Sequence, residues 1–480
     1  ATRGRVSESG RQRIEDLEHA RQAGRRLGSD LSLAPRLRPF DAFRWRPDDA
    51  EHPTLQLDDV SGIPFLAEIA GVEEYQHRGR LRAGDHDVYV TVTAATPGYE
   101  SYCQERLHMG APEHLVADPV GPPIAVADAC GAGRTYRRLV ELARHANGMM
   151  LHPYMGIEAV WELAAKIGVD AHAPVHVLAP PPPVTWIAND KASFDELVRR
   201  VLGPDALVET RVSTEVEGIV TDLRTLASKH RRVGLKRTRC ASAMGNAVFD
   251  AQSLDDEADA RKALLDFLER TEWPEGEEVL SVAWVETDLS PSTQLWIPPR
   301  GRGEPRLDGI YEQILQGEEK VFVGSRPSTL PEAVNQELGA CAWMVAAALQ
   351  ELGYVGRCSF DHLVSGDPTG EFQVLFTECN GRWGGTSAPM SLLDRLVRGP
   401  RPAYRAQDVV YPKLVGASFE DLLRLVGEEM FDAETGRGRF IFYNVGPLER
   451  HGKFDVISIG ENRQDAERGL LELLPARLGQ

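Results

Sequence analysis

Three polar residues recur at alternate positions in residues 372–387, whose sequence is FQVLFTECNGRWGGTS. They are Glu378, Asn380 and Arg382. Side chains on a strand alternate between its two faces, so an extended run would point all three the same way. A carboxylate, an amide and a guanidinium on one face could bind a metal ion beside an anion, or they could be an exposed strand with a salt bridge.

A second carboxylate, Asp361, lies in the preceding apolar run at residues 357–364. The turn-forming sequence SGDPTG separates the two runs, and the midpoint between Asp361 and Glu378 falls inside it. An antiparallel hairpin would therefore place the two carboxylates side by side, where they repel unless a cation lies between them. Oxygen ligands of this kind suit Mg²⁺, so we predict that Asp361, Glu378 and Asn380 bind it. The alternative is a surface hairpin with a salt bridge.

The composition limits the classes of function. The 480 residues have room for about three domains, and 42% hydrophobic residues are typical of a globular protein. A net charge of −18 argues against binding to nucleic acids or anionic membranes. The six cysteines are scattered, and no apolar run could span a membrane or serve as a signal peptide. We therefore expect a cytoplasmic protein with reduced thiols.

The pattern along the chain divides it into four segments. Residues 1–50 are polar and predict a loosely held arm with one helix. Residues 51–184 alternate strand-like and helix-like runs, which predicts an α/β domain with parallel pairing that ends in a linker at the four prolines 180–183. Residues 185–400 contain the hairpin and a long helix, and residues 401–480 predict a small C-terminal domain.

Only eight of the 54 basic residues are lysines, and two of them lie where a phosphate site would need them. Lys191 follows Ala188-Asn189-Asp190 at a predicted helix start, although Asn189 could be a plain cap and Lys191 solvated. Lys236 ends a predicted strand before a loop of small residues whose backbone N–H groups could contact phosphate oxygens. The loop residues are Ser242, Ala243, Met244, Gly245 and Asn246.

Two further segments are candidates for ligand contacts. The run at residues 282–286 predicts a strand in which Trp284 is either a flat wall for a base or part of the core. The loop after Arg382 could offer backbone N–H groups to a carboxylate or acyl-phosphate, or be an ordinary turn. Its residues are Gly384, Gly385, Thr386 and Ser387. Two histidines in apolar runs, His152 and His362, are interpreted as core or supporting residues.

In this order, the features resemble the ATP-grasp superfamily, in which an Asp on one strand and E-x-N-x-R on the next hold Mg²⁺ against the phosphates of ATP. The sequence ECNGRWGGTSAP is similar to the E-x-N-L-R-x-G-G-T-T-H-P signature of the pheganomycin-type peptide ligases. In those ligases a Lys at a strand end precedes an S-G-x-G-N loop, and Lys236 with residues 242–246 is similar to this arrangement. Gly381 replaces the usual Leu, Ala243 replaces a glycine, and Ser387-Ala388 replaces Thr-His.

The resemblance implies an ATP-grasp fold with an N-terminal pre-ATP-grasp α/β domain and a small C-terminal cap. It implies that Lys191 and Lys236 bind phosphates, that the 240s loop covers them, and that Arg382 and Lys236 act in catalysis. Backbone groups of a hinge strand would bind adenine. The carboxylate of either Glu286 or Asp288 would bind the ribose. The residues implied for the nucleotide are Ala283, Trp284, Val285, Glu286 and, in the tract YEQILQG, Gln313.

The implied activity is an ATP- and Mg²⁺-dependent ligation of a carboxylic acid to the amine of an amino acid or peptide through an acyl-phosphate, in specialised peptide biosynthesis. Two other classes stay open. One is a different ATP-grasp enzyme, a carboxylase or phosphotransferase, and the other is a nucleotide-binding protein without turnover. The sequence identifies neither substrate, and it leaves a homodimer open.

Overall fold

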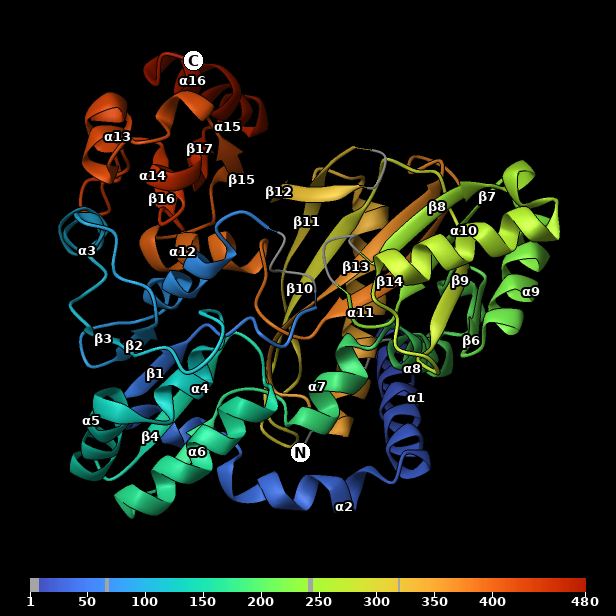
Figure 1. Cartoon of the computed structure of the whole chain (residues 1–480), viewed down its shortest axis with the longest axis horizontal. Helices are drawn as coiled ribbons and strands as arrows, with labels where there is room; N and C mark the ends of the chain where they lie inside the picture. Colours follow the sequence, from blue (N-terminus) through green and yellow to red (C-terminus); the bar gives the residue numbers. More distant parts are fainter. Residues whose placement is uncertain (1–7, 65–68, 241–244, 318–319) are drawn as a thin grey trace. The chain divides into compact units, whose positions relative to one another are not determined.

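The computed structural model describes residues 8–64, 69–240, 245–317 and 320–480, and the chain divides into two compact units (Figure 1). The first unit takes its described residues from the ranges 1–39, 183–310 and 328–381. The second takes them from 40–182, 311–327 and 382–480. Each unit joins segments far apart in the sequence, so each depends on long-range packing.

A four-stranded antiparallel sheet in the first unit has the strand order β6-β9-β7-β8. Its strands are β6 (Thr210–Ser213), β7 (Arg232–Arg237), β8 (Asn246–Asp250) and β9 (Val279–Ala283). Two helices, α9 (Val216–Ala227) and α10 (Glu257–Arg270), pack side by side against it (Figure 1). Their apolar faces form one core with the inward side chains of β7, which include Val233 and Leu235.

The other strands of this unit are β10 (Pro291–Ile297), β13 (Gly356–Gly366) and β14 (Phe372–Asn380). They pair antiparallel in the order β14-β13-β10. The strand β11 (Arg306–Gln316) crosses from the first unit into the second at Ile310 and Tyr311. The helices that share a hydrophobic core with these strands are α1 (Glu8–Asp30), α7 (Pro182–Asn189), α8 (Lys191–Leu202) and α11 (Glu332–Leu352).

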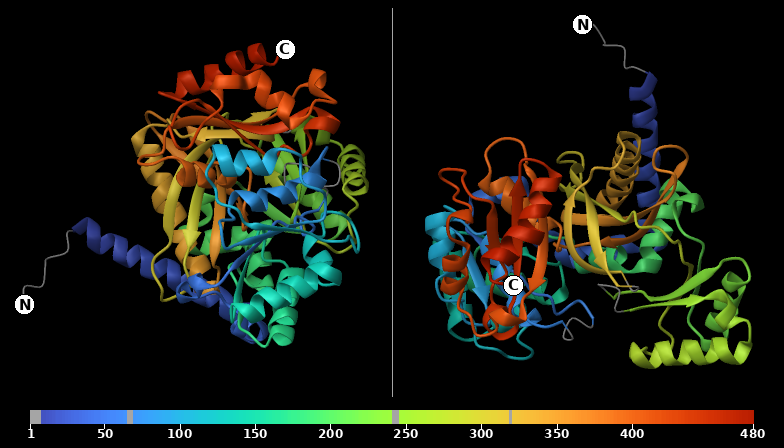
Figure 2. Two further views of the ribbon diagram at one scale, coloured as in Figure 1. Left: turned by 90° about the vertical axis from the view of Figure 1, so that its left-hand side faces the viewer. Right: turned by 90° about the horizontal axis from the view of Figure 1, so that it is seen from above.

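Helix α1 packs along α11 in the core of the first unit (Figure 2). Leu17 and Leu27 are buried, whereas Ile14 is exposed. At Gly24 the two helices are so close that a Cβ atom would lie 2.5 Å from the carbonyl oxygen of Ala348. The expectation of a loosely held arm is therefore wrong for α1, because small residues allow it to pack closely.

The second unit contains a parallel sheet with the order β3-β2-β1-β4-β5, which confirms the predicted parallel α/β layer. Its strands are β1 (Thr54–Leu57), β2 (Val88–Thr91), β3 (Glu113–Val116), β4 (Met149–Pro153) and β5 (Val175–Val177). The helical segments between them are η4 (Val72–Leu81), α3 (Tyr99–Ser101), η5 (Tyr102–Arg106), α4 (Val126–Cys130), α5 (Gly133–His145) and α6 (Glu158–Ala171). The strand order reverses between β1 and β4.

An antiparallel set of strands completes the second unit, with β12, β15, β17 and β16 as successive neighbours. They are β12 (Val321–Pro327), β15 (Ala403–Val410), β16 (Phe440–Tyr443) and β17 (Lys453–Gly460). The α-helices here are α12 (Ser387–Leu396), α13 (Phe419–Val426), α14 (Leu448–His451), α15 (Arg463–Arg468) and α16 (Leu474–Arg477). A core rich in aromatic side chains joins these elements to η5, and it includes Tyr102, Phe419 and Phe442.

Short helical segments connect the main elements. They are α2 (Leu33–Leu37), η1 (Arg38–Phe43), η2 (Pro47–Glu51), η6 (Pro204–Ala206), η7 (Ala251–Leu254), η8 (Pro412–Leu414), η9 (Gly427–Glu429) and η10 (Gly469–Leu473). The four-proline run is more than a linker, because α7 begins at Pro182 and proline is tolerated in a first helical turn. Among the described helices, none has the length and apolar character needed to cross a membrane.

Candidate functional site

The hairpin of β13 and β14 has the predicted register. Asp361 lies directly opposite Glu378, and Ser359 lies opposite Asn380. The Asn380 side chain donates a hydrogen bond from Nδ2 to Asp361 Oδ2 at 3.0 Å. The prediction that both carboxylates and the amide lie together is confirmed by this pairing.

The strand pairing of the hairpin is irregular next to Asp361. The pairing shifts between Asp361 and His362, so that His362 pairs with Phe376 and Thr377 is the extra residue. His362 is fully buried on the opposite face, where Thr293 Oγ1 lies 2.9 Å from its Nε2. Burial lowers the pKa of His362 to about 3, which makes it a neutral core residue as interpreted.

Lys191 reaches the hairpin from the first turn of α8. Its Nζ lies 2.9 Å from Glu378 Oε2 and donates a hydrogen bond to the carbonyl oxygen of Cys240 at 2.7 Å. The residue is buried, with 5% of its surface exposed, so it is not a solvated surface lysine. The helix cap is Asp190, which accepts a hydrogen bond from the Ser193 amide, so the alternative of Asn189 as the cap is wrong.

Asn189 instead contacts Gly381, and this contact explains why glycine replaces the leucine of the ligase signature. Its Oδ1 accepts a hydrogen bond from the Gly381 amide at 3.0 Å. A Cβ atom on Gly381 would lie 2.6 Å from Asn189 Nδ2 and 3.0 Å from Ala188 Cβ. A leucine at position 381 would not fit here, so Gly381 allows α7 to pack closely against the end of β14.

Lys236 lies on β7 opposite Asn246 and is half-buried. Burial lowers the pKa of Lys236, and the positive charge of Lys191 acts in the same direction, whereas Glu378, Asp195 and Asp361 oppose the shift. These electrostatic neighbours place Lys236 in the same cluster as the hairpin carboxylates. Two lysines and two hairpin carboxylates of the first unit therefore converge as predicted.

Asp195 is a member of this cluster that the sequence did not reveal. It lies on α8 one turn after Lys191 and is buried, with 8% exposure. Burial raises the pKa of the Asp195 carboxyl to about 7, and Lys236, Arg199 and Lys191 partly oppose that shift. The i, i+4 spacing from Lys191 was the available signal, because residues four apart lie on one helix face.

Part of the predicted covering loop can be described. Ser242, Ala243 and Met244 lie outside the described residues. The Gly245 carbonyl accepts a hydrogen bond from the Arg237 amide at 2.9 Å, and Asn246 begins β8. A Cβ atom on Gly245 would lie 2.4 Å from Cys240 Cβ, so this position requires glycine.

The hinge segment is shorter than expected, because β9 ends at Ala283. The Ala283 amide donates to Glu209 O at 2.8 Å and the Trp284 amide to Arg232 O at 3.0 Å. These two N–H groups are therefore used within the protein, which leaves carbonyls or the Val285 amide for a base. Trp284 is half-buried, and the Lys236 ammonium lies over its ring, 5.6 Å from the centroid.

The ribose candidates differ in their contacts. Glu286 is exposed and forms ion pairs with Arg231 at 2.8 Å and Arg232 at 3.4 Å, and these arginines lower the pKa of its carboxyl. Asp288 is also exposed. Glu286 would have to leave two arginines to bind a hydroxyl, so the choice between the two remains a prediction.

Arg382 lies in the second unit, past the end of β14 at Asn380. The expectation that it continues the strand is therefore wrong. Its Nη1 donates hydrogen bonds to Tyr154 Oη at 3.2 Å and to the Trp383 carbonyl at 3.0 Å. Trp383 in turn donates from Nε1 to His152 Nε2 at 3.1 Å, which gives His152 a supporting role as interpreted. Arg382 is thus positioned by residues at the end of β4.

The glycine loop after Arg382 leads into α12. The Gly384 amide donates a hydrogen bond to Ser387 Oγ at 2.7 Å, so this N–H is used inside the turn and is not available to a carboxylate. A Cβ atom on Gly385 would lie 2.4 Å from the Phe322 ring. Thr386 and Ser387 are buried at the helix start. For Gly384, the structure therefore corrects the predicted substrate contact.

Gln313 lies on β11 in the second unit, opposite Ser325 of β12, and is half-buried. Its neighbour Glu312 forms an ion pair with Arg463 at 3.0 Å. The nucleotide role of Gln313 remains a prediction. In the described residues, no group of three or more His, Cys, Asp or Glu side chains could hold a metal ion. Any metal at the hairpin would therefore depend on an amide oxygen as well as two carboxylates.

Comparisons with known proteins agree with this architecture. A family model described as the Pre ATP-grasp domain matches residues 76–169. An N5-carboxyaminoimidazole ribonucleotide synthetase, solved as an ADP complex, has a TM-score of 0.53 at 14% identity and covers 89% of this chain and 99% of its own.

Two further solved structures are similar. The Aspergillus clavatus N5-carboxyaminoimidazole synthase, with ADP and 5-aminoimidazole ribonucleotide, has a TM-score of 0.52 at 12% identity and covers 90% of this chain and 100% of its own. The biotin carboxylase of Campylobacter jejuni has a TM-score of 0.51 at 12% identity, with 87% and 89% covered. No curated protein was found to match by sequence. At these identities, the likenesses show the fold.

Replacing Asp195 by Asn should change how stability depends on pH. The folded pKa of about 7 lies above the ordinary value of 3.8, so the folded state holds the proton more tightly and the wild type loses stability as pH rises from about 4 to 7. Each pKa unit corresponds to about 1.4 kcal/mol, so the loss amounts to a few kcal/mol. Asp195→Asn should flatten this slope in urea unfolding at pH 5 and 7.5. An unchanged slope would show that Asp195 is not the titrating group, and Asp205→Asn is the control.

Proposed function

With an ATP-grasp fold and an N-terminal pre-ATP-grasp domain, we propose that this chain is an ATP-dependent carboxylate-amine ligase. One observation carries the proposal. Lys191 and Lys236 converge on Asp361 and Glu378 in the first unit, on a lysine-poor chain. Cations beside paired carboxylates and an amide oxygen are the groups that a metal-bound nucleoside triphosphate needs.

The residues fit Mg²⁺ by the chemistry of their donor atoms. Asp361, Glu378 and Asn380 supply only oxygen ligands, and Mg²⁺ is commonly bound by one or two carboxylates together with substrate phosphates. Bound there, Mg²⁺ would neutralise charge on the β- and γ-phosphates. Lys191 Nζ is close to Glu378 and can turn its hydrogen bonds toward a phosphate oxygen.

The protein's own groups would act in two steps. Lys191 and Lys236 would orient the γ-phosphate and stabilise its transfer to a substrate carboxylate, which gives an acyl-phosphate and ADP. An amine would then attack the acyl carbon and expel phosphate, forming the amide. Arg382 is assigned to the oxyanion of this second step from its place in E-x-N-x-R. The loop at residues 242–246 is assigned to excluding water.

The finer assignment is to ligation of an amino acid or peptide. It is supported by the similarity of ECNGRWGGTSAP to the peptide-ligase signature, and by Gly381, whose departure from that signature has a local steric reason. A carboxylase is the second candidate, because two of the similar structures are an N5-carboxyaminoimidazole synthase and a biotin carboxylase. Bicarbonate would then be the acid, so dependence on bicarbonate separates the two.

Removing either hairpin carboxylate should abolish turnover without unfolding the protein. In Asp361→Asn and Glu378→Gln the repulsion between the two carboxylates is lost, so the fold should persist while the metal loses a charged ligand. ADP formation and the melting temperature are measured together. Glu371→Gln, in the exposed turn of the same hairpin, is the control. Near-normal activity in either variant would remove that residue from the metal site.

Alanine at Lys191 or Lys236 should weaken ATP binding by about 1 to 3 kcal/mol, which is the range for a lost hydrogen bond to a charged group. Calorimetric titration of Mg-ATP measures this directly. Lys229→Ala is a matched control, because Lys229 is an exposed lysine of the same unit that pairs with Glu209. If both variants bind ATP with wild-type affinity, the lysines do not contact the phosphates.

ADP release should require an acid, and hydroxylamine should replace the amine. A panel of carboxylic acids is incubated with enzyme, Mg-ATP and hydroxylamine, because this small nucleophile converts an acyl-phosphate to a hydroxamate. ADP and a hydroxamate are expected from the same acid. AMP with pyrophosphate would indicate an adenylate and contradict the proposal. ADP release that depends on bicarbonate alone would favour the carboxylase.

A further inference from the structure

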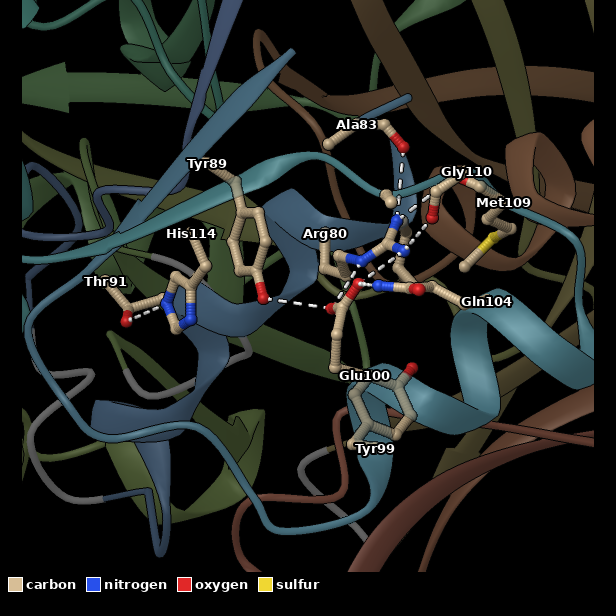
Figure 3. Close-up of polar contacts among 12 residues, drawn as sticks. Arg80, Ala83, Tyr89, Thr91, Tyr99, Glu100, Gln104, Met109, Gly110 and His114 are labelled. Carbon is tan, nitrogen blue, oxygen red and sulfur yellow. Dashed lines mark hydrogen bonds and ion pairs between the residues drawn. The ribbon is translucent and has the colours of Figure 1, made fainter. Parts of the chain in front are cut away.

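Three arginines alternate in the sequence RGRLR at residues 78–82, in and just after η4 of the second unit. Arg80 is fully buried and donates five hydrogen bonds, two of them to Glu100 and the others to the carbonyls of Ala83, Met109 and Gly110 (Figure 3). Figure 3 shows Tyr89 and Gln104 donating to the same Glu100 carboxylate. Every donor group of this guanidinium is therefore used.

Arg82 also donates most of its N–H groups within the protein. It donates to both carboxylate oxygens of Asp58, to Gln56 Oε1 at 3.0 Å and to the His152 carbonyl. Its guanidinium also lies over the Trp383 ring, 4.7 Å from the centroid. Arg80 and Arg82 thus hold η4 against the parallel sheet. These hydrogen bonds use all five N–H groups of Arg80 and four of the five of Arg82.

Arg78 differs from its two neighbours. Its side chain is 11% exposed, and its ion pair with Asp455 is long, at 3.6 Å. Its Nε is buried and makes no hydrogen bond within the described part of the chain. Its guanidinium lies over the Tyr75 ring, 4.2 Å from the centroid. A buried donor without a partner costs free energy, so this arginine is held ready for an acceptor that the described residues do not supply.

A second unpaired atom lies on the other side of Asp455. Asn444 is 3% exposed and donates from Nδ2 to Asp455 Oδ2 at 3.2 Å, while its Oδ1 has no partner among the described residues. Its backbone has a φ of 50°, which is strained for a residue other than glycine. Asp455 Oδ2 therefore contacts both residues. Arg78 carries the unpaired donor, Nε, and Asn444 carries the unpaired acceptor, Oδ1.

The charges around these atoms balance. Lys453 lies 3.3 Å from Asp408 and donates to the Tyr75 hydroxyl at 3.0 Å, so it is already used. Two cations and two carboxylates give the cluster no formal net charge. Burial raises the pKa of Asp455 to about 6, and Asp408 adds to the effect, while Arg78 and Lys453 oppose it. A neutral site favours a ligand with one charge of each sign over a simple amine or a simple acid.

The cluster also borders residues assigned to the reaction. The pKa of Arg78 is raised by Asp455 and by tyrosine neighbours that include Tyr154. The Tyr154 hydroxyl accepts a hydrogen bond from Arg382. All of these residues belong to the second unit. A ligand on Arg78 would therefore lie one tyrosine away from the arginine assigned to the oxyanion.

We propose that Arg78, Asn444 and Asp455 form a subsite for the α-amino acid that serves as the amine substrate. Arg78 binds the carboxylate through its unpaired Nε, and Asn444 Oδ1 with Asp455 binds the amine nitrogen. The donor and acceptor are separated by a single carboxylate, which suits the adjacent charged groups of an α-amino acid better than the distant termini of a dipeptide. This inference rests on the proposed ligase function for its role, but not for the binding itself.

Binding is tested by thermal shift with the intact protein and the twenty common L-amino acids as probes. Each amino acid is compared with its amide, and glycine is also compared with methylamine. At least one amino acid should raise the melting temperature, whereas its amide, which lacks the carboxylate, should not. Arg78→Gln and Asn444→Gly should lose the shift. Asn444→Gly keeps the fold testable if Arg78→Gln does not fold, because glycine relieves the positive φ.

Arg450→Gln is the matched control, because Arg450 is an exposed arginine of the same unit that pairs with Glu73. It should keep the full shift. In steady-state assays, Asn444→Gly should raise KM for the amino acid at least tenfold, while the affinity for ATP and the yield of hydroxamate stay unchanged. A merely structural role would change all of these quantities together.

Two results would overturn the subsite. One is that no amino acid stabilises the wild type, and the other is that Arg78→Gln and Asn444→Gly bind it with wild-type affinity. Failure of the ligase proposal has a different signature, since amino-acid binding would still depend on these residues although no acid supported ADP release. If hydroxamate forms but no amino acid binds in this way, the ligase proposal stands and the subsite proposal is wrong.

Discussion

The repulsion between Asp361 and Glu378 is the constraint around which the first unit is arranged. Two like charges 4 Å apart repel by about 4 kcal/mol at an effective dielectric constant of about 20. The hairpin register forces these carboxylates to be neighbours, so the surrounding elements must supply positive charge. Helix α8 brings Lys191 from one side and β7 brings Lys236 from another. A bound Mg²⁺ would share this task, which is why the same arrangement suits a metal nucleotide.

Local rules were sufficient for the hairpin and the parallel sheet. Alternating apolar residues on both sides of SGDPTG determine the register that pairs Asp361 with Glu378, because a slip by one residue would bury the polar face. The alternation of strand-like and helix-like runs in residues 51–184 similarly predicted the parallel layer that contains β4 and α6. These features depend on residues close together in sequence, so the sequence alone defines them.

Features set by tertiary contacts escaped prediction. The strand ends at Asn380 because Gly381 packs against Asn189, about 190 residues earlier, and Arg382 then turns to Tyr154. Helix α1 is tied to the core by the close approach of Gly24 to Ala348, which no amphipathic pattern reveals. The three arginines of RGRLR look equivalent in sequence, and only their partners distinguish Arg78 from Arg80 and Arg82.

The central claim is that a substrate carboxylate receives the γ-phosphoryl group of ATP. Once an acid that supports ADP release is known, it can be labelled with ¹⁸O in its carboxylate and the product phosphate analysed by mass spectrometry. Attack by the carboxylate on phosphorus leaves one of its oxygens in the phosphate when the amine displaces it. The account predicts one ¹⁸O atom in each phosphate formed with the amide. Phosphate without label, or label found in AMP, would contradict it.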